Sequence, residues 1–144
     1  MLVDDVIARL QDRVPDLSGR IEGAAHFAQL QAQNQLPHVT PAANVISTGL
    51  QGGVPDAASG LFRQSFDETI GVILTFRNAP GKGERALDRV DTIKLAVIEA
   101  ICGWAPEEMV GVFRLVRGAI VSFAAGTLVY QIEFAAGDQL RITP

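Results

Sequence analysis

The sequence is poor in cysteine, in clustered positive charge and in long apolar runs. Its single cysteine, Cys102, cannot close a disulfide within the chain, which excludes a small secreted scaffold built on disulfides. The residues around Cys102 are apolar, so we interpret it as a small buried hydrophobic residue and not as a catalytic thiol. No apolar run approaches the roughly 20 residues that span a bilayer. The first residues, MLVDDVIARL, lack the basic start of a signal peptide. We therefore expect a soluble protein that is made in the cytoplasm and has no membrane partner.

Positive charge is neither abundant nor clustered. The chain has 12 lysines and arginines against 16 aspartates and glutamates, for a net charge of −4. Tight binding of nucleic acid depends on basic side chains gathered against phosphates, and no such cluster occurs here. A mildly acidic surface instead repels DNA.

Residue types with chemical potential are present but do not form a recognisable site. The two histidines, His26 and His38, are twelve residues apart and have no cysteine or carboxylate at zinc-ligand spacing. The segment 81–83, Gly-Lys-Gly, lacks the earlier glycine and the following serine or threonine of a phosphate-binding loop. Asp67 and Glu68 are adjacent, and adjacent residues of a strand point to opposite faces. We therefore predict no catalytic residue, no metal site and no cofactor.

Hydrophobic periodicity predicts a single domain over residues 1–144, of the α+β class. Its sheet is expected to be mainly antiparallel, with the helices packed on one face. The predicted helices are residues 2–13, 24–32 and 84–103. The predicted strands are residues 42–47, 61–76, 113–123 and 128–134, with a last short strand at 140–142 after Gly137-Asp138, and turns are expected at 78–83 and 124–127.

Residues 49–60, GLQGGVPDAASG, are predicted to form a loop. The segment contains four glycines, one proline and a single charge, which are cues against a regular element. A loop of this length in a small domain is either functional or disordered.

Several stretches together resemble the small phage tail terminator proteins of prophages and siphophage-like tails. The resemblance covers nearly the whole chain and is spread over MLVDDVIARLQDRVP, RIEGAAHFAQL, FRQSFDETIGVIL, ALDRVDTIKLAVIEAICGWAP and GVFRLVRGAIVSFAAGTLVYQIEFAAGDQLRI. It implies a fold similar to that of lambda-like minor tail proteins and no catalytic motif.

The resemblance also implies partners and a location. Similar proteins form rings, usually hexamers, that cap the last ring of tail-tube protein and stop its polymerisation. They then offer a surface to the head-to-tail connector, at the neck end of the virion tail, with DNA only passing through the lumen. A composition that is 48% hydrophobic leaves apolar surface for such neighbours. Three alternatives stay open: a head-completion or connector ring protein of the neck, a small cytoplasmic enzyme with a scattered site, and a ligand-binding domain.

Two sets of residues are candidates for the contacts of such a ring. Glycine-rich segments adapt on binding, so the first set is expected to contact the tube or the connector; it comprises Gly52, Gly53, Val54, Pro55, Asp56 and Ser59. Arginine is favoured at interfaces, so the second set is expected to form charge pairs between subunits; it comprises Arg63, Arg77, Arg114 and Arg117 with Asp67, Glu68, Glu107 and Glu133.

Overall fold

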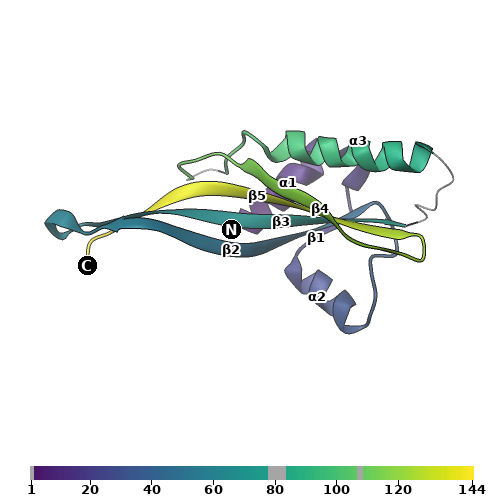
Figure 1. The fold of residues 1–144 in the computed structure, drawn as a ribbon, viewed down its shortest axis with the longest axis horizontal. Helices are drawn as coiled ribbons and strands as arrows, with labels where there is room; N and C mark the ends of the chain where they lie inside the picture. Colours follow the sequence, from purple (N-terminus) through teal and green to yellow (C-terminus); the bar gives the residue numbers. More distant parts are fainter. Residues whose placement is uncertain (1, 78–83, 107–108) are drawn as a thin grey trace.

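The computed structural model describes residues 2–77, 84–106 and 109–144, which form one five-stranded sheet with helices against it (Figure 1). In chain order the elements are α1 (Leu2–Arg13), a 3-10 turn (Pro15–Leu17), β1 (Ile21–Glu22), α2 (Ala24–Ala32), β2 (Ala42–Asp56), a 3-10 turn (Ala58–Gly60), β3 (Phe62–Arg77), α3 (Glu84–Ile101), β4 (Arg114–Ala124) and β5 (Thr127–Ile142). The strand order is β1-β2-β3-β5-β4, and only the short β1–β2 pair is parallel. The predicted α+β class with a mainly antiparallel sheet is confirmed.

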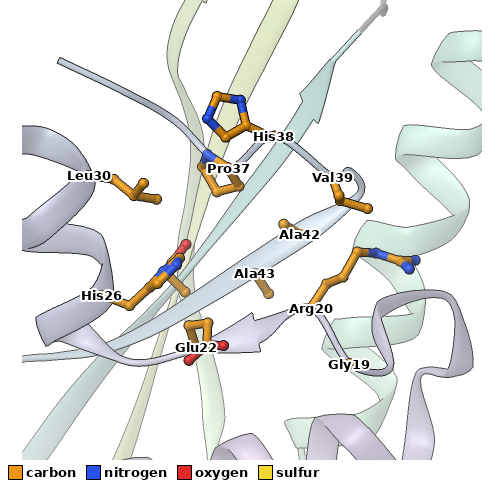
Figure 2. A pocket seen from close by; sticks show the side chains of 11 residues that line it. Gly19, Arg20, Glu22, His26, Leu30, Pro37, His38, Val39, Ala42 and Ala43 are labelled. Atoms are coloured by element: carbon orange, nitrogen blue, oxygen red, sulfur yellow. The ribbon is translucent and has the colours of Figure 1, made fainter. Parts of the chain in front are cut away.

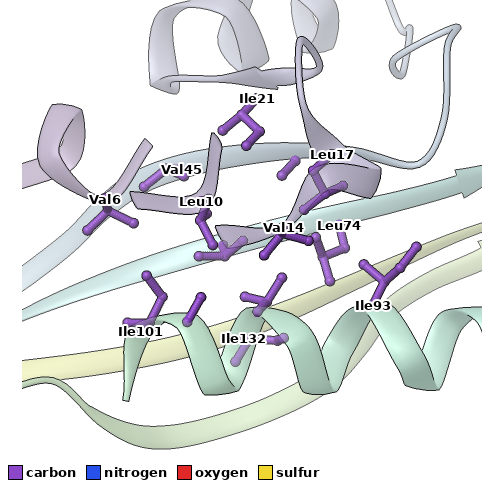
Figure 3. Packing of buried hydrophobic residues seen from close by; sticks show 14 of the residues in the cluster. Val6, Leu10, Val14, Leu17, Ile21, Val45, Leu74, Ile93, Ile101 and Ile132 are labelled. Carbon is purple, nitrogen blue, oxygen red and sulfur yellow. The ribbon is translucent and has the colours of Figure 1, made fainter. Parts of the chain in front are cut away.

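The apolar core lies between one face of the sheet and the helices α1 and α3. Val6 and Leu10 of α1 are buried in one cluster with Ile93 and Ile101 of α3 and with Leu74 of β3 (Figure 3). This arrangement follows from the periodicity of the sequence, because apolar residues three or four apart lie on one side of a helix. The even-numbered residues of β3 from 70 to 76 share the core face, as predicted.

α2 departs from the expectation that the helices would pack on one face. It lies on the opposite side of the sheet from α1 and α3 (Figure 1). Its contact with the sheet runs through Asn44, whose neighbours Ala43 and Val45 point the other way, into the core. α2 contains no fully buried residue, so this second layer is thinner and more polar than the first.

Residues 49–56 are a strand and not the predicted loop. They continue β2 and pair with the start of β3, so that only the few residues around Ala58–Gly60 turn the chain. The glycines and Pro55 are accommodated by two irregularities, between Ser47 and Gly49 and between Gly52 and Pro55. Bulges of this kind absorb residues that a regular ladder disfavours.

The remaining boundaries agree with the sequence to within a few residues, with one exception at the end of the chain. Gly137 and Asp138 do not introduce a separate last strand, because β5 runs without interruption from Thr127 to Ile142. The predicted hairpin turn between β4 and β5 is confirmed, with Ala125 and Gly126 both at positive φ. The predicted turn at 78–83 lies outside the described residues.

Arg9 of α1 contacts the C-terminal end of α3. Its Nε donates a hydrogen bond of 2.9 Å to the carbonyl oxygen of Ala100, and its guanidinium lies 5.1 Å from the ring centroid of Trp104. A guanidinium over an aromatic face is attracted to the ring, and it also meets the negative end of the helix dipole here. Arg9 therefore joins α1 to α3 through a contact between two residues that are 91 positions apart in sequence.

Replacing Arg9 with methionine should lower the free energy of unfolding by about 1–2 kcal/mol, because a charge-assisted hydrogen bond and a cation–π contact are lost together. Urea titration followed by far-UV circular dichroism measures this difference. Arg13→Met is the control, since the Arg13 side chain is more than half exposed and, among the described residues, forms an ion pair only with Asp12. An equal loss in both variants would show that the contacts of Arg9 do not matter.

Candidate assembly surfaces

The outer edge of the sheet is formed by β4, an apolar strand that its own chain leaves uncovered. In the described part of the chain no strand pairs with the far side of β4. Five of its apolar side chains are between 46% and 62% exposed: Leu115, Val116, Ile120, Val121 and Phe123. Leu115, Ile120 and Phe123 share the core side of the sheet with their partners on β5, and we call these three residues the β4 surface. An exposed apolar edge strand offers both backbone hydrogen-bonding groups and apolar area to another chain.

A three-stranded arm extends beyond the helices at the other end of the sheet. It consists of residues 49–56 of β2, 62–69 of β3 and 135–142 of β5, and it projects to the left in Figure 1. The β3–β5 pairing is regular along its full length, from Arg77–Thr127 to Phe62–Ile142. The arm is therefore a paired extension of the sheet and not a loop.

The two faces of the arm differ in character. Residues paired across strands share a face. The face continuous with the core carries Leu50, Phe62, Phe66, Leu140 and Ile142, with Gln64, Glu68 and Asp138 among them. The opposite face carries Gln51, Arg63, Ser65, Asp67, Gln139 and Arg141. The first set, which we call the apolar arm face, continues the core side of the sheet past the end of its helices.

Two carboxylates lie close together on the apolar arm face. Burial raises the pKa of Glu68 above its ordinary value of 4.5, and the nearby negative charge of Asp138 raises it further. The only described ion pair on the arm, Arg114 with Asp67, is on the opposite face. The apolar arm face is thus weakly acidic, and none of the residues that form it is basic.

The raised pKa of Glu68 predicts a pH dependence of stability. The folded state binds the proton of the Glu68 carboxyl group more tightly than the unfolded state does. The free energy of unfolding therefore falls as the pH rises from 4.5 through the pKa of Glu68 in the folded state. Glu68→Gln should therefore increase the melting temperature at neutral pH, and the gain should vanish below about pH 4.5. Thermal melts across this pH range measure the gain in melting temperature. Asp138→Asn should narrow the pH interval over which stability falls, because it removes one cause of the raised pKa. A gain that is constant with pH would contradict the assignment.

The predicted contact residues of the first set are at the tip of the arm. Val54 is 90% exposed, next to Pro55. The tip is ordered by two hydrogen bonds, from Gln64 Nε2 to the carbonyl oxygen of Gly53 (2.9 Å) and from the Ala58 amide to Asp56 Oδ1 (3.0 Å). Gly52, Gly53, Val54, Pro55 and Asp56 are thus brought together, while the side chain of Ser59 lies outside the described part of the structure.

The charged residues of the second set are not brought together as one group. Arg77 donates hydrogen bonds of 2.6 and 3.0 Å to the carbonyl oxygens of Pro37 and Leu36 of its own chain. Arg114 pairs with Asp67 of its own chain at 3.0 Å. Glu133 accepts a hydrogen bond from Gln131, beside Arg117 across the β4–β5 ladder. Arg63 lies exposed on the polar face of the arm, Glu68 lies on its other face, and Glu107 is outside the described residues.

The apolar residues of β4 and of the apolar arm face were not among the predicted site residues. The sequence contains the signal that places them on strands, because apolar residues alternate through both segments. Alternation predicts one buried face, but it does not show where the covering helices end. The exposure of these residues therefore depends on the tertiary structure and could not be predicted from the local sequence.

A small cavity under α2 gathers polar residues from distant parts of the chain. It has a volume of about 220 Å³, and Glu22, His26, His38 and Asn44 are among the residues that line it (Figure 2). Asn44 is buried, and its Nδ2 lies 3.2 Å from His26 Nδ1. Among the described residues no group of three or more His, Cys, Asp or Glu side chains could hold a metal ion. The contacts of this cavity hold α2 on the sheet.

The comparisons with known proteins agree with an assembly role. A family model described as "Phage tail terminator protein" matches residues 1–144, the whole chain. No protein with a curated description matches it. In the described parts of the chain no helix is long and apolar enough to cross a membrane.

Proposed function

The chain belongs to the phage tail terminator family, whose members are structural proteins of the virion tail, and we propose that it forms a closed ring on the end of the tail tube. The ring, of about six copies as the family resemblance implies, occupies the growing face of the tube and stops its polymerisation. Its outer face receives the head-to-tail connector, and DNA passes through its lumen. This role needs shape and surface chemistry and no catalytic residue.

The observation that carries the proposal is the uncovered β4 surface. An apolar edge strand with Ile120 62% exposed and Phe123 56% exposed is costly to leave in water and prone to uncontrolled pairing. A ring covers the same surface on every copy, because a head-to-tail contact repeated around a closed circle leaves no free end.

The tip of the arm supports a contact with another component of the tail. The arm projects from the body of the subunit (Figure 1). Close to its turn at Ala58–Gly60 it carries Val54, an apolar side chain that is 90% exposed. In the proposed ring this tip contacts the tail-tube protein or the connector.

The direct test is negative-stain microscopy of the protein mixed with tail tubes assembled from the tube protein of the same phage or prophage. Rings on tube ends, together with tubes of uniform length, are the expected result. Binding to portal or connector protein, with tube ends left free, would instead identify a ring of the neck. Absence of binding to tube ends at every protein concentration would contradict the proposed function.

Val54→Asp should abolish the capping of tube ends while leaving the fold unchanged, because a charge replaces an exposed apolar contact at the tip. The fraction of capped ends counted in micrographs measures the effect, and circular dichroism checks the fold. The matched control is Leu95→Asp, which places the same charge at a 55% exposed leucine on α3. Equal capping by both variants would show that the tip is not a contact.

A further inference from the structure

We propose that α2 is a lid over the second face of the sheet, the face opposite to the one that α1 and α3 cover (Figure 1). The lid consists of α2 and the turn that follows it, residues 24–35, and it opens as one unit while the rest of the fold stays intact. Opening changes the surface that the subunit presents to other proteins. The inference does not depend on the proposed ring.

α2 is held on the sheet by few contacts. None of its nine residues is fully buried, and a helix of this length is marginal in water without packing. Among the described residues its only side-chain hydrogen bond to the sheet joins His26 Nδ1 and Asn44 Nδ2, which are 3.2 Å apart. Gly23, at the N-terminus of α2, provides no capping side chain. A short helix without such a cap and without a buried face detaches at a low cost in free energy.

The carboxamide of Asn44, beneath α2, is incompletely bonded in the closed form. Asn44 is 1% exposed, and its Oδ1 has no hydrogen-bond partner among the described residues. A buried acceptor without a partner costs free energy, which is recovered when water reaches the group. Opening of α2 gives water this access, so the unpaired oxygen of Asn44 favours the open form.

Hollows flank α2 on both sides. On one side is the cavity of about 220 Å³ that His26 and Leu30 of α2 line together with Glu22 and His38 (Figure 2). On the other side is a hollow of about 580 Å³, which Phe27 of α2 lines together with residues of the sheet. Protein interiors are normally packed with few voids larger than a water molecule. α2 therefore rests on the sheet through a narrow contact.

The segments on either side of the lid are anchored to the rest of the fold. Before the lid, β1 pairs with β2, and the Ala43 amide donates a hydrogen bond of 2.9 Å to the carbonyl oxygen of Arg20. After the lid, Arg77 donates hydrogen bonds of 3.0 and 2.6 Å to the carbonyl oxygens of Leu36 and Pro37. None of these bonds involves a residue of the lid, so they persist when α2 moves.

Two residues are placed to act as hinges. Gly23 lies between β1 and α2, and glycine has the widest backbone freedom of all residues. Asn34 lies near the end of the lid at a φ of 54°, in the left-handed region that asparagine adopts more readily than most residues with a side chain. Rotation at these two positions lets residues 24–35 move while both anchored segments stay in place.

Opening of the lid uncovers apolar side chains of the second face. Ile73 and Val129 are 5% and 4% exposed, although neither belongs to the core cluster under α1 and α3. With Ile46 they line the hollow beside α2, together with Phe27 of the lid. An open subunit therefore offers an apolar strip across β2, β3 and β5 that a closed subunit hides.

Hydrogen exchange of the full chain, measured residue by residue by NMR, tests the opening. After correction for intrinsic exchange rates, the amides of α2 should be protected about a hundredfold less than those of residues 70–76 of β3. Low concentrations of urea should reduce the protection of β3 but not that of α2, because a local opening exposes far less surface than global unfolding. The Ala43 amide, in the first anchored segment, should stay as protected as β3. Equal protection of α2 and β3, or exchange of Ala43 together with α2, would overturn the proposal.

Phe27→Ala distinguishes a lid from a fixed part of the fold. Phe27 is half-buried, and its truncation should speed the exchange of the α2 amides by about tenfold while leaving β3 unchanged. Gln29→Ala is the control, because Gln29 is exposed on the same helix and both sets of amides should stay within about twofold of the parent. A loss of protection by the same factor in α2 and β3 would show that the two unfold together and would overturn the proposal, as would α2 amides that do not respond to Phe27→Ala.

Discussion

Phe113→Ala is expected to lower the free energy of unfolding by about 3–5 kcal/mol, the range measured when a buried aromatic side chain is deleted. Phe113 is 1% exposed and stacks on Trp104 with ring centroids 5.9 Å apart. Its amide donates to the carbonyl oxygen of Trp104 (2.8 Å), and its own carbonyl oxygen accepts from the Gly103 amide (2.9 Å). The side chain therefore anchors the passage from α3 to β4, and its removal leaves a cavity at that point.

A domain of this size has a free energy of unfolding of about 5–15 kcal/mol, so Phe113→Ala should remove a large fraction of the total stability. Urea titration followed by tryptophan fluorescence measures the change, since Trp104 is the only tryptophan. Val110→Ala is the control, because Val110 is 75% exposed and should change stability by less than about 0.5 kcal/mol. A loss below about 1 kcal/mol for Phe113→Ala would contradict its role as an anchor.

Gly111→Ala is expected to destabilise the fold by about 1–3 kcal/mol, through crowding and not through a cavity. A Cβ atom at this position would lie 2.9 Å from the carbonyl oxygen of Gly137 and 3.3 Å from its nitrogen. Both are backbone atoms of β5, so no side chain can move aside to relieve the contact. The hydrogen bond from the Gly111 amide to the same oxygen, now 3.0 Å, would lengthen as the segments separate.

The effect of Gly111→Ala should also be concentrated where β5 enters the arm. Hydrogen exchange should report faster exchange of amides near Gly137 than in the core strands. Gly49→Ala is the matched control, since nothing lies within 4 Å of the Cβ that it would add. Equal stability of the two variants would show that the close approach at Gly137 relaxes without cost.

The parts of the fold predicted correctly are those in which local pattern and tertiary environment agree. In α1 and α3 the apolar residues recur at helical spacing, and the same residues form the core. In β3 the residues Ile70, Val72 and Leu74 alternate with others and are buried on one face. The class of the fold follows from this agreement.

The segment 49–56 shows where local reasoning failed. Glycine and proline disfavour the interior of a central strand, but this part of β2 is an edge strand beyond its short pairing with β1. The segment pairs with residues 63–69 of β3. On its other side β3 pairs with residues of β5 that lie more than 75 positions after the segment 49–56. No local window of sequence contains that information.

The candidate contacts were less predictable than the fold. Residues at the tip of the arm could be singled out because their composition is unusual, although they were assigned to a loop. The arginines could be recognised as potential interface residues, but only the structure shows that Arg77 and Arg114 bond within their own chain. The exposed apolar residues of β4 could not be identified, because exposure depends on where α3 ends relative to the sheet.

The composition of the arm has a consequence for the order of folding. Its strands come from β2, β3 and β5, and Phe62 pairs with Ile142, eighty positions later. Pairings so distant in sequence form late, because a long loop must close first. During synthesis the arm stays incomplete until residues 135–142 have emerged from the ribosome, after every other element has been made. A nascent chain therefore cannot present a finished arm to any partner before β5 is complete.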